Sequence, residues 1–335
     1  MLLNPTVLAL ILVSLSVSGM LLLASVFAVR ILRHWDIKSG SELQISLERR
    51  TYLISTILAW VFMAELIALL LFVYNAEALS SQFTGAMCAT GVLNINGYGW
   101  PTLFLKIALF FLGAIWLILN HIDRKGYDYP LVRIKYALLL LIAPLVWAEA
   151  LLQLLYFLNM DPDVITSCCG SLFSADAEGV AAEISSFTPR TAMLLLVGSG
   201  AAVMISGVAY ARRQVGGLLF TVISLIAFVS ALIATVSFIA LYIYEHPHHH
   251  CPFCILKAGH DFRGYLLYIP LFAATALALG SGLMSRFRHI PSLSAAIEAE
   301  TPTMTWMALL GYLIFYLIAA WSVLGSNLIL GENWW

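Results

Sequence analysis

Eight apolar stretches, each about 20 to 28 residues long, dominate the sequence and restrict what it can fold into. A helix needs roughly 20 apolar residues to cross the hydrocarbon core of a bilayer, and in lipid each backbone amide must be satisfied within the segment. Runs such as residues 137–142 lack the alternation of a membrane β-strand. We therefore predict an all-α polytopic membrane bundle of about eight transmembrane helices. The stretches cover about 5–29, 51–74, 102–121, 136–159, 191–211, 217–244, 264–285 and 305–329.

The composition excludes a soluble globule. Hydrophobic residues make up 61% of the chain and charged residues 10%, whereas soluble domains carry about 25% charged residues. The formal net charge is −1, so the chain has no overall basic field to attract nucleic acid. We expect one membrane domain over residues 1–335, with the lipid bilayer as its surroundings.

The distribution of basic residues predicts an orientation. Thirteen of the seventeen Lys and Arg residues lie in every second connection between the predicted spans. These basic connections include residues 30–50 and 124–135. Because cytoplasmic loops are enriched in Lys and Arg, both termini should be exoplasmic, in a plasma (inner) membrane. No basic segment precedes the first span, so we interpret it as a retained helix and not as a cleaved signal.

The chain also contains an internal similarity. Residues 64–75 (AELIALLLFVYN) resemble residues 148–159 (AEALLQLLYFLN), and a cysteine-containing outer connection follows the second, fourth and sixth spans. This pattern predicts repeated helical hairpins at about 1–95, 96–180, 181–260 and 261–335. If the repeat holds, the three cysteine connections should gather around one outer vestibule.

The strongest local motif is residues 245–254, Glu-His-Pro-His-His-His-Cys-Pro-Phe-Cys. All five cysteines are predicted on the outer side, where disulfides can form. The first thiol of a Cys-x-x-Cys pair is often acidic, and a second cysteine pair could pass electrons onward by thiol–disulfide exchange. The candidate catalytic residues are Cys251, Cys254, Cys168, Cys169 and Cys88.

Cys251-Pro252-Phe253-Cys254 resembles the active-site motif of glutaredoxin-type and thioredoxin-type oxidoreductases. Its position between two spans is similar to that in the quinone-linked disulfide-forming membrane proteins and the vitamin K epoxide reductase family. The resemblance covers this one loop, and those families have four or five helices. It implies a quinone-linked thiol–disulfide oxidoreductase that exchanges with an exoplasmic thiol protein, with redox roles for Cys251 and Cys254.

Two other interpretations of the same residues remain open. A tract rich in His and Cys is typical of a Cu or Zn site in a transporter or metallochaperone. Alternatively, the cysteines are structural staples, as in a membrane anchor subunit docked to respiratory subunits. The candidate metal ligands are His246, His248, His249, His250, Cys251 and Cys254.

Charged side chains within the spans form a second candidate site. Glu65 and Glu149 lie about ten residues from the outer ends of their spans, roughly 15 Å deep. A lone carboxylate there should be neutral, paired or facing water, and Lys106 is the available cation. We predict a Glu–Lys pair, with Gln153 in the same network, and assign Glu65, Glu149 and Lys106 to binding a cofactor or carrying its protons.

Other residues in the spans are predicted to serve packing. Trp60 and Trp147, each shortly before its glutamate, are expected in the core. The pair Ala278 and Gly282 has the small-x-x-x-small spacing of closely packed membrane helices.

Overall fold

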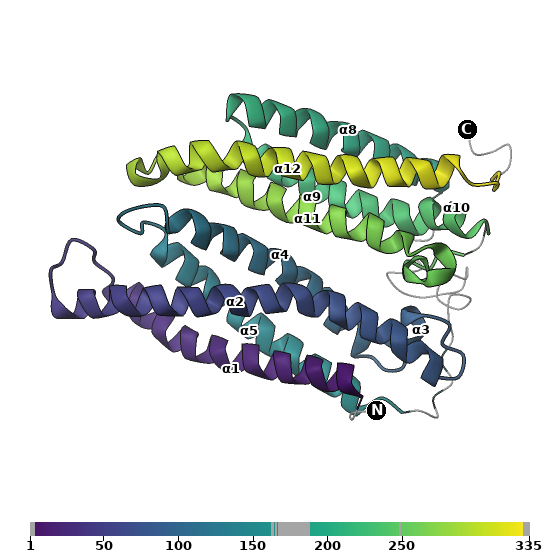
Figure 1. The fold of residues 1–335 in the computed structure, drawn as a ribbon, viewed down its shortest axis with the longest axis horizontal. Coiled ribbons are helices and arrows are strands. Elements are labelled where there is room, and N and C mark those ends of the chain that lie inside the picture. Colours follow the sequence, from purple (N-terminus) through teal and green to yellow (C-terminus); the bar gives the residue numbers. More distant parts are fainter. Residues whose placement is uncertain (1–3, 162–163, 165, 167–187, 248, 331–335) are drawn as a thin grey trace. The chain divides into compact units, whose positions relative to one another are not determined.

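The computed structural model describes residues 4–161, 164, 166, 188–247 and 249–330. Within these residues, eight helices are long and apolar enough to cross a membrane, and no β-strand is present. The protein is therefore an all-α polytopic membrane bundle, as predicted (Figure 1). The spans are α1 (Pro5–His34), α2 (Glu42–Leu79), α4 (Gly99–Asp123), α5 (Val132–Leu158), α8 (Pro189–Arg213), α9 (Gly217–Ala234) continued by η2 (Thr235–Ile239) and α10 (Ala240–Tyr244), α11 (Arg263–Met284) and α12 (Pro291–Leu324). The short helices are η1 (Ser80–Gln82), α3 (Ala89–Leu93), η3 (Cys254–Leu256), η4 (Ala258–His260) and η5 (Ser285–Phe287).

Two helices extend well beyond the predicted spans. α2 begins at Glu42 instead of about residue 51, and α12 begins at Pro291 instead of about residue 305. Hydropathy marks only the part of a helix that suits lipid, whereas backbone hydrogen bonding continues into a polar flank. The 38 residues of α2 span about 57 Å at 1.5 Å per residue, far more than the roughly 30 Å hydrocarbon core.

Local residues define several helix ends. The Asn4 side chain accepts a hydrogen bond of 3.1 Å from the backbone N–H of Thr6, and Pro5 occupies the first helical position of α1. Thr188 and Pro189 begin α8 in the same way. Its end is marked by Gln214 in the left-handed conformation, and Gly216 has a φ of 84°. The chain thereby reverses into α9 within a short turn.

Contacts divide the chain into two compact units. The first unit comprises Met1–Leu79, Leu93–Val164 and Arg288–Ile297, and the second unit comprises Ser80–Val92, Ile165–Phe287 and Glu298–Trp335. Each is described by itself below. The single domain over residues 1–335 and the hairpin repeats stay predictions.

The first unit is built on four helices. α1 packs against α2 and α5, and α4 packs against the same two helices. Large apolar side chains from all four fill the centre, and Phe62 and Trp116 place their ring centroids 4.8 Å apart. Trp60 and Trp147 are not part of this core, because they are 74% and 44% exposed. Their predicted core position is wrong, since a lipid-facing surface is as apolar as a core and hydrophobicity alone does not separate the two.

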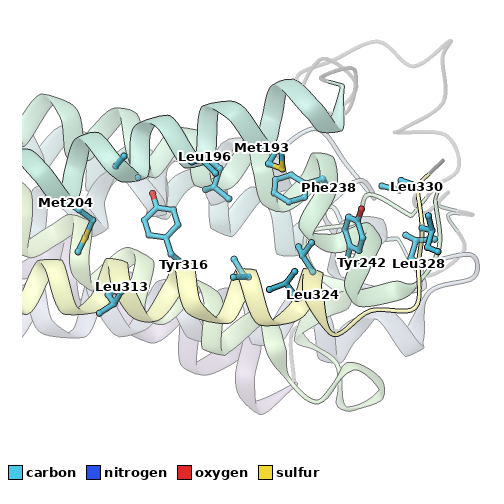
Figure 2. Close-up of a pocket in the computed structure, with 17 residues that line it drawn as sticks. Met193, Leu196, Met204, Phe238, Tyr242, Leu313, Tyr316, Leu324, Leu328 and Leu330 are labelled. Carbon is cyan, nitrogen blue, oxygen red and sulfur yellow. The ribbon is translucent and has the colours of Figure 1, made fainter. Parts of the chain in front are cut away.

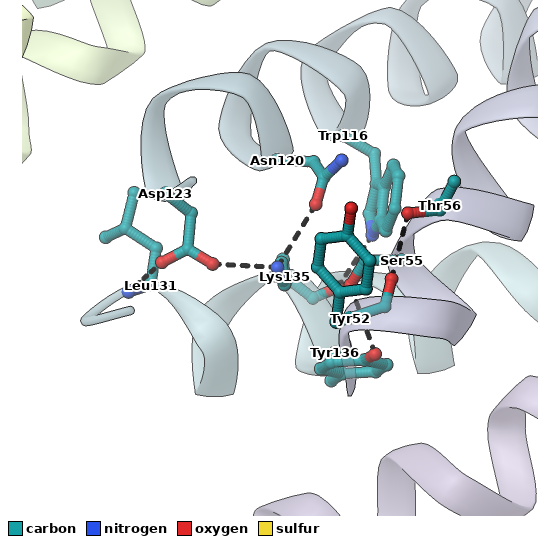
Figure 3. A network of polar contacts seen from close by, with 9 residues as sticks. All are labelled: Tyr52, Ser55, Thr56, Trp116, Asn120, Asp123, Leu131, Lys135 and Tyr136. Carbon is teal, nitrogen blue, oxygen red and sulfur yellow. Dashed lines mark hydrogen bonds and ion pairs between the residues drawn. The ribbon is translucent and has the colours of Figure 1, made fainter. Parts of the chain in front are cut away.

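A polar network joins α4 to the start of α5 (Figure 3). Lys135 Nζ lies 2.7 Å from a carboxylate oxygen of Asp123 and donates to Asn120 Oδ1 at 3.1 Å. Asp123 also accepts a 2.8 Å hydrogen bond from the backbone N–H of Leu131, and Trp116 Nε1 donates to the Lys135 carbonyl. From the sequence, Lys135 is predicted to be a loop cation. In the structure it is a buried side chain whose ion pair closes the α4–α5 connection.

In the second unit, α9 packs against both α8 and α11. The Tyr312 hydroxyl of α12 donates to the Ser224 carbonyl of α9 at 3.1 Å and lies 3.0 Å from the Thr275 hydroxyl of α11. α12 therefore completes the helical packing of this unit.

Two glycines allow α9 and α11 to approach closely. A Cβ atom added at Gly282 would lie 2.1 Å from Oγ1 of Thr221 and 2.4 Å from the carbonyl oxygen of Gly217. A Cβ at Gly217 would in turn lie 2.3 Å from Oγ of Ser285. The predicted close packing at Gly282 is therefore confirmed.

Gly282→Ala should lower the free energy of unfolding by about 1–3 kcal/mol, because the added methyl group overpacks the α9–α11 contact. The matched control is Gly19→Ala in α1, where an added Cβ meets no atom within 4 Å. Thermal unfolding of the purified protein in detergent measures both changes. Equal unfolding midpoints for the two variants would contradict the packing account.

Candidate functional site

Three cysteines from two distant parts of the chain meet in the second unit. Their sulfur atoms all lie within 4.8 Å of one another, and the Sγ atoms of Cys88 and Cys251 are 3.3 Å apart. This distance is longer than the 2.05 Å of a disulfide bond, so no disulfide joins Cys88 to Cys251 in the structure. Cys88 and Cys251 are fully buried, whereas Cys254 is 6% exposed. We call these three residues the thiol cluster.

The loop that carries Cys88 is held by backbone geometry. Gly85 has a φ of 87°, and a Cβ there would lie 2.1 Å from the carbonyl oxygen of Thr166. Only glycine fits this approach. The backbone N–H of Thr166 donates to the Thr84 carbonyl, and its hydroxyl donates to the Gly91 carbonyl at 2.8 Å. These bonds fix the segment on both sides of Cys88.

The Cys-Pro-Phe-Cys turn is held by hydroxyl groups from two helices. Tyr244, at the end of α10, donates to the Cys251 carbonyl at 2.5 Å, and Tyr268 of α11 donates to the Pro252 carbonyl at 2.9 Å. The Thr90 hydroxyl lies 3.2 Å from Cys251 Sγ. Lys257 Nζ also donates to the carbonyl of Met87, the residue before Cys88. The Thr90 hydroxyl therefore contacts one sulfur of the cluster, and the Lys257 ammonium group binds the loop that carries Cys88.

The histidines lie around the turn but outside the thiol cluster. His250 Nδ1 is 3.0 Å from the carbonyl oxygen of Val236 in η2, and the His249 ring stacks on Tyr244 with a 4.1 Å centroid distance. His260 contacts the same tyrosine ring. Burial, followed by neighbouring His249, lowers the pKa of His260.

The predicted metal ligands therefore separate into cysteines, which lie close together, and histidines, which lie apart from them. Among the described residues, the group with ligand atoms close enough to share one ion consists of the three cysteines alone. The structure does not bring His246, His249 or His250 into that group. His248, Cys168 and Cys169 lie outside the described residues.

A large apolar cavity of about 780 Å³ also belongs to the second unit (Figure 2). Ligand pockets for small molecules and cofactors are typically about 300–1,000 Å³. The cavity lies between α8 and α12 and reaches the segment after α12, with Met193, Met204, Leu313 and Leu328 among its lining residues. Sequence reasoning missed it, because α8 and α12 are apolar on several faces and the sequence does not show which faces fail to meet.

A π-helical turn connects the cavity to the thiol cluster. η2 (Thr235–Ile239) interrupts the sixth span, and such turns are frequent at functional sites. Phe238 of this turn lines the cavity, while the Val236 carbonyl contacts His250, the neighbour of Cys251. One short segment therefore lines the cavity and contacts the residue next to Cys251.

The predicted Glu–Lys pair is confirmed in the first unit. Lys106 Nζ lies 2.7 Å from Glu149 Oε1 and 4.0 Å from Glu65 Oε1, and all three side chains are at most 3% exposed. The Phe72 ring lies beside the ammonium group, with 5.7 Å from Nζ to the ring centroid. Three helices, α2, α4 and α5, thus each contribute one charged residue to a buried cluster.

Gln153 does not join this cluster. Its amide donates to the Ser14 hydroxyl at 2.8 Å and to the Leu10 carbonyl at 3.3 Å. Both partners belong to α1, because the next turn of α5 faces that helix. The predicted membership of Gln153 in the glutamate network is therefore wrong.

Comparison of the chain with protein-family models, with curated proteins and with solved structures finds no match.

Proposed function

We propose that the protein is a quinone-linked thiol–disulfide oxidoreductase whose thiol cluster faces the exoplasmic side of the plasma (inner) membrane. The observation that supports this proposal is the close approach of Cys88, Cys251 and Cys254, with sulfur atoms within 4.8 Å of one another. Attack of a thiolate on a disulfide requires three sulfurs in contact. In this cluster Cys251 can exchange one disulfide between Cys254 and Cys88.

The proposed cycle has two balanced steps. A quinone takes two electrons and two protons from Cys251 and Cys254, which gives quinol and a Cys251–Cys254 disulfide. An exoplasmic protein dithiol then reduces this disulfide by exchange and itself becomes a disulfide. Cys254 is the entry point in this scheme, because it is the most exposed of the three thiols. Alternatively, the Cys88 thiolate can attack Cys251 in the Cys251–Cys254 disulfide, which gives a Cys88–Cys251 disulfide and releases Cys254 as a thiolate.

Neighbouring groups suit these steps. A thiolate is the attacking species, and a nearby hydroxyl or cation favours it. Thr90 lies 3.2 Å from the Cys251 sulfur, and Lys257 binds the Cys88 loop. If His250 donates from Nδ1 to the Val236 carbonyl, its Nε2 is the nitrogen that can accept a proton.

We assign the quinone to the apolar cavity between α8 and α12. Its volume of about 780 Å³ and apolar lining suit a quinone ring with part of its isoprenoid tail. The hydroxyl-bearing side chains of Tyr242 and Tyr316 also line it. The π-helical turn lines the cavity through Phe238 and contacts His250, the neighbour of Cys251, through the Val236 carbonyl. Through this turn, quinone binding in the cavity can affect the cysteines.

A test of the assignment is Ala201→Trp, which places an indole in the cavity. We expect the KM for a soluble quinone analogue to rise roughly tenfold, a loss of about 1.4 kcal/mol of binding. Exchange of the preformed disulfide with a dithiol should be unchanged. The matched control is Leu219→Trp, at a position 61% exposed on α9. A KM that rises equally in both variants would exclude this cavity as the quinone site.

The second candidate function is a soft-metal site, and the same cluster favours it. Three thiolates suit Cu(I), and with a fourth ligand they suit Zn²⁺. Burial of all three sulfurs also suits a small ion. The two functions differ in the state of the thiols as the protein is isolated, because a bound metal ion keeps them from reacting until a chelator removes it.

A further inference from the structure

The buried charges of the first unit have no part in the thiol chemistry proposed above. Glu65 of α2, Lys106 of α4 and Glu149 of α5 are 3%, 1% and 0% exposed. Glu149 lies nine residues before the end of α5, which places it roughly 14 Å from that end of the helix. A carboxylate at such depth is costly unless it is neutralised, and intramembrane ionisable groups of this kind often carry protons.

The geometry assigns unequal environments to the two carboxyl groups. Lys106 Nζ is 2.7 Å from Glu149 and 4.0 Å from Glu65. The ammonium therefore neutralises Glu149 at contact distance. The oxygens of both carboxyl groups lack a hydrogen-bond partner among the described residues, so the distance to the ammonium is what distinguishes the two. Ionised Glu65 would be a buried charge whose cation lies 4.0 Å away, already in contact with Glu149, which is an unfavourable arrangement for a carboxylate.

The charge balance leads to the same conclusion. Two carboxylates and one ammonium give a net charge of −1 in a site sealed from water. Lys106 is the cation that the described residues pair with these carboxyl groups. The charged residues of α1 are Arg30 and Arg33, in its last two turns. Uptake of one proton makes the cluster neutral without any further residue.

We propose that Glu65 is an intramembrane proton-binding site, which holds one proton while Lys106 and Glu149 remain ion-paired. The step is the conversion of the Glu65 carboxylate and one proton to the carboxylic acid, and the charge of the cluster changes from −1 to zero. Lys106 can switch between the two carboxyl groups, because its Nζ is only 1.3 Å farther from Glu65 than from Glu149. The proton then moves to Glu149.

The test is infrared spectroscopy of the full chain in lipid nanodiscs near pH 7. The wild type should show the C=O band of a buried carboxylic acid, and the band should shift in D₂O. Glu65→Gln should abolish it. Glu149→Gln should abolish it as well, because Glu65 then becomes the ionised partner of Lys106. The matched control is Glu42→Gln, an exposed position at the start of the same helix, which should retain the band.

Three results would overturn the proposal. They are a wild type without the band near pH 7, a band that persists in Glu65→Gln, and a band that appears only when Na⁺ is replaced by choline. The last result would assign the site to Na⁺ instead of a proton. The wild-type measurement requires no substitution, so poor folding of a variant does not prevent a decision. It involves no cysteine, so the outcome is independent of the proposed thiol function.

Discussion

Cys254→Ser and Cys251→Ser should each reduce quinone-dependent oxidation of a protein dithiol by at least about 10³-fold, to the background rate. Removal of a covalent nucleophile leaves only residual binding effects, and a serine hydroxyl cannot form the disulfide. The readout is the absorbance change on quinone reduction by the reconstituted protein with a reduced thioredoxin-like protein as the electron donor. The loss should be in kcat.

The control variant for this pair is Thr90→Val, which removes the hydroxyl group 3.2 Å from the Cys251 sulfur and keeps all three thiols. Its rate should fall by roughly 10-fold to 150-fold, since one hydrogen bond to a charged group contributes about 1.5–3 kcal/mol. Unfolding midpoints should be similar for all variants. Turnover in Cys254→Ser within threefold of wild type would refute the redox scheme.

Lys106→Met should lower the free energy of unfolding by about 3–5 kcal/mol at pH 8. Removal of one partner from a buried ion pair leaves the other as an uncompensated charge, and here two buried carboxyl groups lose the cation that pairs with them among the described residues. Both must then be protonated in the folded state. The folded protein binds more protons than the unfolded chain, so the destabilisation should decrease as the pH falls from 8 to 5.

The double variant Lys106→Met/Glu149→Gln should recover most of the lost stability, because it removes the charge that Lys106 neutralises. Thermal unfolding in detergent at several pH values gives all the required comparisons. If Lys106→Met is equally destabilised at pH 5 and pH 8, or if Glu149→Gln does not rescue it, then the ion pair does not account for the contribution of Lys106 to the free energy of unfolding.

Features imposed by the bilayer could be predicted from the sequence. Span number and helical type follow from the length of the apolar stretches, because lipid permits few alternatives. Lys106 was identified as the partner of the glutamates for the same reason, since a buried carboxylate requires a cation nearby. The helix ends at Glu42 and Pro291 were not predicted, because polar flanks outside the lipid need no apolar residues.

Features set by packing could not be predicted in the same way. Cys88 and Cys251 are 163 residues apart in sequence, and the sequence predicts that the cysteine connections gather around one outer vestibule but not which thiols meet there. It assigned the histidine tract to the same metal site, whereas His249 stacks on Tyr244 and His250 contacts a backbone carbonyl. Imidazole rings pack as well as they ligate, and only the fold decides between these uses.

The cavity and the exposed tryptophans could not be predicted from the sequence for one and the same reason. In a soluble protein an apolar face marks the core, but in a bilayer it marks either a helix neighbour or lipid. Trp60 therefore faces outward at 74% exposure despite its size. The cavity between α8 and α12 could not be predicted from the sequence for the same reason.

The central claim is that Cys88, Cys251 and Cys254 form a redox-active thiol cluster. The most direct measurement is intact mass after alkylation without reductant, on protein extracted anaerobically from membranes, before and after incubation with quinone. Digestion locates any bridge. We predict that quinone removes two alkylatable thiols, that the bridge joins Cys251 and Cys254, and that mild reductant restores both. Thiols of the cluster that remain unoxidised with quinone, or that react only after a chelator is added, would contradict the account and assign the cluster to a metal ion.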